Sequence, residues 1–276
     1  LNWLSAAFAV HLAYEGRTWD EIARLSEIAP TAEISDPDVL IMHGDTAALT
    51  GQWSQAADVY RRIIAGGDKR WVVFFRYAML VAASGDQNEY RSACQRLIDR
   101  HTGDQKPKMT IELMLACMVG EDALSEWTPL VEVARAAVAR DPSNPAFASG
   151  LGVALLKAGR IEEARLVLKS AVPLHAVAAL AAPQFKGQLN LSLFMTWLHL
   201  AQAYQLEGDD KLARESIERA EKVLASIHQS SSKYDEALPI WTARYAGHVG
   251  RQQLEATRLF PSNPIRQPAA PQTSIP

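Results

Sequence analysis

Residues 145–178 read PAFASGLGVALLKAGRIEEARLVLKSAVPLHAVA, and this stretch decides the fold. Its apolar and small side chains recur at the spacing of an α-helix, once before Gly159 and once after it. The same arrangement returns 49 residues later, over residues 194–227. Numbered from the first residue of each stretch, the shared positions are 4, 7, 8, 11, 15, 20, 24 and 27 of a 34-residue module. The two stretches are therefore copies of one internal repeat.

Each copy predicts two antiparallel helices joined by a short turn. Positions 4, 7, 8 and 11 form one apolar stripe on the first helix, and positions 20, 24 and 27 form another on the second helix. Glycine at position 15 supplies the left-handed residue that ends the first helix. Small residues at positions 8, 20 and 27 let the two backbones approach closely. Because neither helix can bury its stripe alone, each pair must stack on the next pair.

This pattern resembles the tetratricopeptide repeat, a helix–turn–helix unit. Extending the register along the chain gives six copies, at residues 2–35, 37–70, 71–104, 111–144, 145–178 and 194–227. We therefore expect an all-α fold, an α-solenoid of about six such repeats that forms one superhelical domain over residues 1–260, with a C-terminal capping helix within 234–260. The tail 261–276 holds five prolines and no apolar period, so we expect it to be disordered.

Turn and cap residues support the helix boundaries. Asp86 and Glu89 have the spacing of a helix N-terminal cap directly after Gly85. The run Asp141-Pro-Ser-Asn-Pro145 predicts the end of one helix and the start of the next. These local features agree with the 34-residue register.

Some residues depart from the pattern. Tyr90 and Leu130 occupy position 20, and Met118 occupies position 8, where small residues are expected. We expect the helix pairs that contain them to be splayed, unless the register shifts there. Residues 105–110 and 179–193 are interpreted as insertions between units, and the apolar character of the second is unusual for an exposed loop.

Composition narrows the classes of function. The chain has 28 basic and 31 acidic residues, a formal charge of −3, which argues against a nucleic-acid partner or an anionic membrane surface. The longest apolar stretches, around 171–182 and 191–203, carry His, Pro or Gln and are too short to span a bilayer. Two cysteines exclude a disulfide framework and favour, weakly, a reducing cytoplasm. The sequence does not begin with Met, so we expect a fragment of a longer protein.

No set of residues predicts catalysis, a metal or a cofactor. No two of the seven histidines are three or four residues apart, and His43 falls at a core position of its unit. Cys94 and Cys117 also fall at core positions, where they act as small apolar side chains more often than as reactive thiols. An enzyme would require a histidine, an acid and a nucleophile around one deep pocket, and we cannot assemble that set. We expect a non-catalytic protein.

The resemblance implies a binding surface. In this repeat family the first helix of each unit lines a concave face, so the residues expected to contact a bound peptide are Phe75, Arg76, Met79, Leu115, Val119, Val153, Leu156 and Lys157. The predicted groove is apolar, with the two basic side chains at its flanks, and it has no Lys/Asn pair for clamping a terminal carboxylate. Its occupant is a partner helix, an extended segment or the chain's own apolar insertion. The alternative is that these side chains only pack against the neighbouring first helix.

Two functions from the same fold remain open. The first is a protein-interaction scaffold, in which replacing Phe75 and Met79 with Asp is expected to abolish partner capture without unfolding. The second follows from a narrower resemblance, to the tetratricopeptide regions at the C-terminal end of long bacterial serine/threonine kinases and WD40-repeat proteins. Three stretches carry much of it, namely GQWSQAA at 51–57, FRYAML at 75–80 and GVALLKAG at 152–159. It implies a regulatory or spacer region that contacts its own chain.

Overall fold

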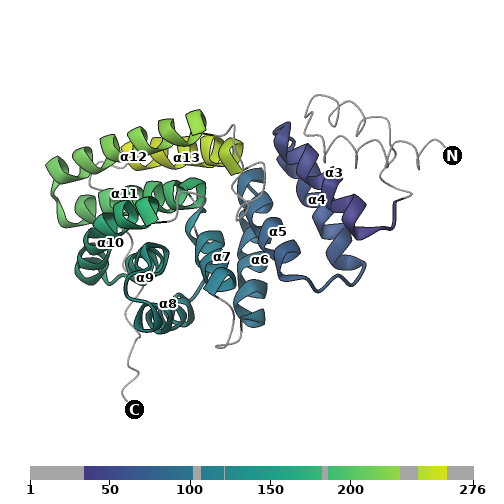
Figure 1. Ribbon diagram of the computed structural model, residues 1–276, viewed down its shortest axis with the longest axis horizontal. Coiled ribbons are helices and arrows are strands. Elements are labelled where there is room, and N and C mark those ends of the chain that lie inside the picture. Colours follow the sequence, from purple (N-terminus) through teal and green to yellow (C-terminus); the bar gives the residue numbers. More distant parts are fainter. Residues whose placement is uncertain (1–33, 102–106, 121, 182–185, 231–241, 260–276) are drawn as a thin grey trace, which may run out of the picture. The chain divides into compact units, whose positions relative to one another are not determined.

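The computed structural model describes residues 34–101, 107–120, 122–181, 186–230 and 242–259. Within these ranges every regular element is an α-helix (Figure 1), and the helices in chain order are α3 (Pro37–Leu49), α4 (Trp53–Ala65), α5 (Trp71–Ser84), α6 (Gln87–Arg100), α7 (Pro107–Met118), α8 (Thr128–Arg140), α9 (Pro145–Lys157), α10 (Ile161–Ala181), α11 (Lys186–Glu207), α12 (Asp210–Ser230) and α13 (Thr242–Leu259). The expected all-α fold of helix pairs is confirmed. The predicted unit 2–35 and the tail 261–276 lie outside the described residues.

The turns between paired helices follow from one or two residues each. Helix α5 ends at Gly85, whose φ of 83° lies in the left-handed region. The next residue, Asp86, then caps α6 by accepting the backbone N–H of Glu89 at 3.0 Å. Gly159 and Gly208 have φ values of 78° and 80° at the corresponding turns. The glycine at position 15 therefore does what the repeat predicts.

The chain divides into two compact units, and each is described by itself. The first comprises Leu1–Ser125 with Ser230–Val249, and the second comprises Glu126–Gln229 with Gly250–Pro276. The predicted repeat 111–144 is divided, because α7 belongs to the first unit and α8 to the second. The assignment of residues 1–260 to a single domain, with its repeat boundaries, stays a prediction.

In the first unit, α3 packs against α4, α4 against α5, and α5 and α6 against each other and against α7. The first part of α13 also belongs here. The ring of Tyr245 meets Trp53 of α4 edge-on at 6.0 Å between centroids. The ring of His248 stacks on the same tryptophan, and its Nε2 lies 3.2 Å from the carbonyl oxygen of Ala83 in α5. A late segment of the chain therefore lies against two early helices.

In the second unit, α9 packs against α8, α10 and α11, and α10 packs against α11. The backbones of α9 and α10 approach so closely that a Cβ on Gly152 would lie 2.5 Å from Cγ of Leu168. The later part of α13 packs against α11, where Gln205 Nε2 donates to the carbonyl oxygen of Thr257 at 2.9 Å. This is the position expected of the C-terminal capping helix.

The structure shows that most of residues 179–193, interpreted as an insertion between repeats, lengthens two helices instead of forming a loop. Helix α10 continues to Ala181 and α11 already begins at Lys186, so most of this segment is helical and Leu191 is buried. The sequence AVAALA at 176–181 contains nothing that ends a helix, and the apolar side chains extend two helices rather than a loop. Residues 107–110, which were placed in the shorter insertion, are likewise the first turn of α7.

Tyr90, the large residue at a position expected to be small, is accommodated by α7. Its ring occupies the space left by Gly120, where a Cβ would lie 2.4 Å from the tyrosine Cε1. Its hydroxyl donates to the carbonyl oxygen of Ala116 at 2.6 Å. The volume that the 34-residue pattern did not allow for is therefore supplied by Gly120, just beyond the C-terminal end of α7.

Candidate functional site

The apolar residues of the predicted groove are buried within the chain. Phe75, Met79, Leu115, Val119, Val153 and Leu156 are each 5% exposed or less. The first four belong to the first unit and the last two to the second. Burial corrects one expectation, because replacing Phe75 and Met79 with Asp would place carboxylates in a core and would unfold the unit that contains them. Their assignment as peptide contacts stays a prediction.

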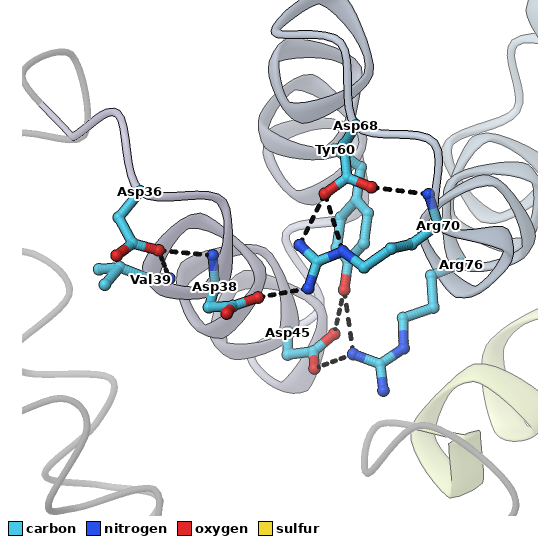
Figure 2. A network of polar contacts seen from close by, with 8 residues as sticks. All are labelled: Asp36, Asp38, Val39, Asp45, Tyr60, Asp68, Arg70 and Arg76. Atoms are coloured by element: carbon cyan, nitrogen blue, oxygen red, sulfur yellow. Dashed lines mark hydrogen bonds and ion pairs between the residues drawn. The ribbon is translucent and has the colours of Figure 1, made fainter.

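Arg76, expected at the flank of the groove, takes part in an ion pair inside the first unit (Figure 2). Its Nη1 lies 2.6 Å from Oδ2 of Asp45 and 3.2 Å from the hydroxyl oxygen of Tyr60. The Tyr60 hydroxyl donates to Oδ1 of Asp45 at 2.7 Å. The Asp45 side chain is 0% exposed and the Arg76 side chain 20%. Burial, followed by the Asp45 charge, raises the pKa of Tyr60 well above its usual value. The network joins α3, α4 and α5.

A second ion-pair group lies beside the first (Figure 2). Arg70 bonds Asp68 at 2.6 Å and also pairs with Asp38 near the start of α3. Asp36 caps α3 through the backbone N–H of Asp38 at 2.9 Å. Because Arg70 and Asp38 are largely exposed, solvent screens this pair and it contributes little stability.

Helix α7 contributes a third buried charge to the first unit. Glu112 accepts the indole N–H of Trp71 at 2.8 Å and lies 4.0 Å from the Lys108 ammonium. Burial raises the pKa of Glu112, an effect that the nearby Lys108 charge opposes. Helices α3, α5 and α7 therefore each carry a buried or half-buried polar group that is paired within the first unit.

Arg76 was expected at the flank of the groove, but its pairing with Asp45 was missed, although a signal for the pairing exists. Arg76 is the single charged residue in α5, whose sequence is WVVFFRYAMLVAAS. Asp45 occupies the middle of α3, in the preceding predicted unit. An isolated charge on an apolar helix requires a buried partner, and opposite charges on successive first helices are the natural pair.

The second unit contains a buried cluster of hydroxyl and imidazole groups. Ser149 Oγ lies 3.0 Å from Nε2 of His175 and 2.7 Å from Oγ1 of Thr196. The Thr196 hydroxyl donates to the carbonyl oxygen of Ser192 at 2.7 Å, so Ser149 must donate to Thr196 and accept the Nε2 proton of His175. This proton count leaves His175 Nδ1 as a buried acceptor without a partner. The Ser149 side chain is inaccessible to solvent, so the pair is a packing contact rather than a nucleophile with its base.

Burial keeps two histidines of this unit neutral. It lowers the pKa of His175 to about 4. Burial, with a smaller effect of the Lys157 charge, lowers the pKa of His199 to about 3. Lys157, expected at the flank of the groove, is half-buried close to this histidine.

These pKa values predict a loss of stability in acid. In the unfolded chain both imidazoles bind a proton near pH 6.5, whereas in the folded chain they do not bind one until about pH 4 or below. Between these values the unfolded state holds more protons, so the free energy of unfolding falls as the pH falls. We expect a loss of about 2 kcal/mol per histidine between pH 7.5 and pH 5, measured by urea unfolding. The double variant His175→Leu/His199→Leu is the control. If its free energy of unfolding falls with pH as steeply as that of the wild type, the acid loss does not come from these two histidines.

Helix α10 presents an apolar side to solvent. Its buried side consists of Ala164, Leu168, Ala171 and His175. Its opposite side is formed by Leu166, Pro173, Val177 and Leu180, which we call the α10 stripe. The exposed fractions of Leu166, Val177 and Leu180 are 55%, 65% and 86%. Spacings of seven, four and three residues place these side chains on one helical face, and residues 170–181 contain no charge. The α10 stripe is therefore a candidate contact surface.

Two further features bear on possible ligands. In the described part of the chain, no three His, Cys, Asp or Glu side chains are grouped so that they could hold a metal ion. Helix α10 is long and apolar enough to cross a membrane by length and composition, with a mean hydropathy of 1.4 over an 18-residue window. Only 22% of that window is buried, on the inner side that packs against α9 and α11.

Comparison with known proteins identifies the repeat in one part of the chain. Residues 131–182, which cover most of α8 and all of α9 and α10, match the family model described as a tetratricopeptide repeat. No curated protein matches the chain.

Solved structures that resemble the chain include three helical-repeat proteins. A tetratricopeptide repeat protein from Parabacteroides merdae is 12% identical, with 93% of this chain and 99% of that chain covered, at a TM-score of 0.48. MamA from Desulfovibrio magneticus RS-1 is 14% identical, with 82% and 96% covered, at 0.36. The TPR2AB domain of yeast Sti1, solved in complex with pHSP90, is 14% identical, with 92% and 97% covered, at 0.29.

Proposed function

We propose that the chain is a non-catalytic protein-interaction scaffold that binds a peptide or a helix of a partner protein. The observation that carries this proposal is the α10 stripe, which lies within the segment that matches the tetratricopeptide repeat. Helix–turn–helix repeats bury one face of each helix against their neighbours, and the remaining faces are available to partners. The α10 stripe is such a face, and it is apolar.

The chemistry of the stripe fits a helical partner. Val177 and Leu180 lie one turn apart, and Leu166 lies about three turns earlier on the same side. Such anchors fit the apolar face of an amphipathic helix, and the uncharged surface over residues 170–181 costs little to remove from water, whereas Lys169 is an exposed charge between Leu166 and Pro173. A protein partner is favoured over a bilayer because inserting α10 would remove its inner side from the core that it shares with α9 and α11.

The predicted groove is the second place where a partner could bind. Its apolar residues are buried, so a partner would reach Phe75 or Met79 only by displacing the segments that cover them. The α10 stripe needs no such rearrangement. Binding measurements on variants with substitutions in the α10 stripe therefore distinguish partner binding at the stripe from partner binding at the predicted groove.

Substitution of the stripe is expected to abolish binding while the fold is retained. Leu180→Glu and Val177→Glu place a charge at positions that are already exposed, so we expect unchanged helix content and stability within about 0.5 kcal/mol. Partners identified by pull-down with the wild type are purified and titrated directly against each variant. We expect affinity to fall at least tenfold, because a charge is buried without a partner.

The matched control is Ala225→Glu, at an exposed position of α12, which introduces the same charge on another helix. It is expected to bind the partner as the wild type does. Equal binding by all the variants would refute the stripe as the contact surface. Loss of binding in the control as well would show that an added negative charge weakens binding wherever it is placed on the surface.

A second function, as a regulatory or spacer region of a longer bacterial signalling protein of kinase or WD40 type, is favoured by one observation. Residues of α13 lie against α4 and α5 of the first unit, so the fold already accepts a distant segment of its own chain. The full reading frame tests this alternative, which requires a further domain encoded in the same gene. A reading frame without one would leave only the scaffold function.

A further inference from the structure

The two cysteines of the chain lie together in the core of the first unit, although they come from different helices. Cys94 is in α6 and Cys117 is in α7, and both are free and 0% exposed. The helices that carry them pack against each other. Cys94 Sγ also lies 3.8 Å from the carbonyl oxygen of Ala116, the residue before Cys117.

Surrounding contacts hold the two helices in this position. The Tyr90 hydroxyl donates to the same Ala116 carbonyl at 2.6 Å and accepts the backbone N–H of Gly120 at 3.1 Å. These bonds fix the end of α7 against α6, next to the sulfur atoms. Because Cys94 reaches the residue next to Cys117, the two cysteines lie on segments in direct contact, as an internal disulfide requires.

We propose that Cys94 and Cys117 form an oxidisable dithiol, which hydrogen peroxide converts into an intramolecular disulfide joining α6 to α7. In the first step a thiolate sulfur attacks one peroxide oxygen, the O–O bond breaks, and a sulfenic acid and water form. In the second step the other sulfur attacks the sulfenic sulfur, the S–S bond forms, and a second water leaves. Overall the two thiols lose two hydrogen atoms, and one peroxide is reduced to two waters.

The environment explains why a small oxidant is required and why the reaction is slow. Both sulfur atoms are inaccessible to solvent, which excludes bulky charged disulfides such as glutathione disulfide but hinders a small uncharged peroxide less. The hydrogen bond to Cys94, together with burial, raises the pKa of Cys117, so little thiolate is present in the closed state. The first oxidation therefore proceeds through transient opening of the contact between α6 and α7. The second step is fast, because the sulfur that attacks the sulfenic acid comes from the adjacent segment of the same core.

Treatment of the full chain with hydrogen peroxide tests the proposal. After incubation the protein is denatured, free thiols are blocked with N-ethylmaleimide, and the intact mass is measured without reductant. We expect both thiols to be lost together, the mass to fall by two hydrogen atoms, and one linked peptide to contain both residues. Dithiothreitol should restore both thiols, and the oxidised protein should unfold at a higher temperature, because the disulfide restricts the unfolded chain.

The single variants Cys94→Ser and Cys117→Ser supply the matched control. Each keeps one buried thiol with no resolving partner, so we expect oxygen addition at the remaining sulfur and no internal cross-link. Three outcomes in the folded wild type would overturn the proposal: independent oxidation of the two sulfurs to sulfinic acids, cross-linking only between chains, or thiols that stay reduced until the protein is unfolded in urea. Because the mass readout is made on the wild type, it does not depend on the folding of the variants.

Discussion

Replacing Arg76 with methionine is expected to lower the free energy of unfolding by about 3–5 kcal/mol. The reason is the burial of its partner. The Asp45 carboxylate is 0% exposed, and without the guanidinium it stays in the interior as a charge supported by the Tyr60 hydroxyl. Methionine keeps most of the volume of the aliphatic part of arginine, so the loss of stability measures removal of the positive charge and not creation of a cavity. Urea unfolding followed by circular dichroism measures it.

Substitution of the other partner of the ion pair, Asp45, is expected to lower the free energy of unfolding by a smaller amount. In Asp45→Asn the remaining charge is that of Arg76, which is 20% exposed and able to reach water, so we expect a loss of about 1–2 kcal/mol. The double variant removes both charges, and we expect it to be more stable than Arg76→Met alone. A double variant as unstable as the sum of the two single changes would show that the side chains act independently.

Phe75→Asp is expected to unfold the first unit, with a loss of more than about 4 kcal/mol. The side chain is 1% exposed within α5, so the aspartate would either remain charged in the core or bind a proton at a high cost in free energy. Circular dichroism at 25 °C should show reduced helix content, and limited proteolysis should cleave within residues 34–125. A folded variant with wild-type stability would show that this position opens to solvent, as the concave-face prediction requires.

Two further substitutions in the same helix separate the effect of burial from that of helix propensity. Val72→Asp introduces the same residue at a position that is 36% exposed in the first turn of α5, so we expect a change within about 0.5 kcal/mol. Phe75→Leu keeps an apolar side chain and is expected to cost about 1 kcal/mol. If all three substitutions are equally destabilising, the loss of stability comes from a general effect on the α5 helix and not from burial of the side chain at position 75.

The helix pairs could be predicted because their causes are local. Gly85, Gly159 and Gly208 end helices in the left-handed conformation that the repeat requires, and Asp86 caps the helix that follows. Each depends on residues within one turn of the chain, and such relations are visible in a pattern.

The binding surface could not be predicted in the same way. A register position states which side of a helix carries Phe75 or Met79, but not which later segment covers that side. The ion pair of Asp45 with Arg76 joins residues 31 positions apart, and a search for apolar periodicity does not pair them. The α10 stripe was missed for a third reason, because the repeat pattern states which positions of the second helix are buried, and Leu166, Pro173 and Val177 occupy other positions while Leu180 lies beyond the unit.

Pro173 has a consequence for what can bind to α10. Proline has no backbone N–H, so the carbonyl oxygen of Lys169, one turn earlier, lacks its helical donor. Both residues are exposed, and the oxygen lies near the α10 stripe between Leu166 and Val177. A wholly aliphatic ligand covering this carbonyl would deprive it of water without replacing the lost bond, whereas an indole or carboxamide N–H at the same place would satisfy it. The preferred ligand is therefore expected to have a tryptophan, asparagine or glutamine among its apolar side chains.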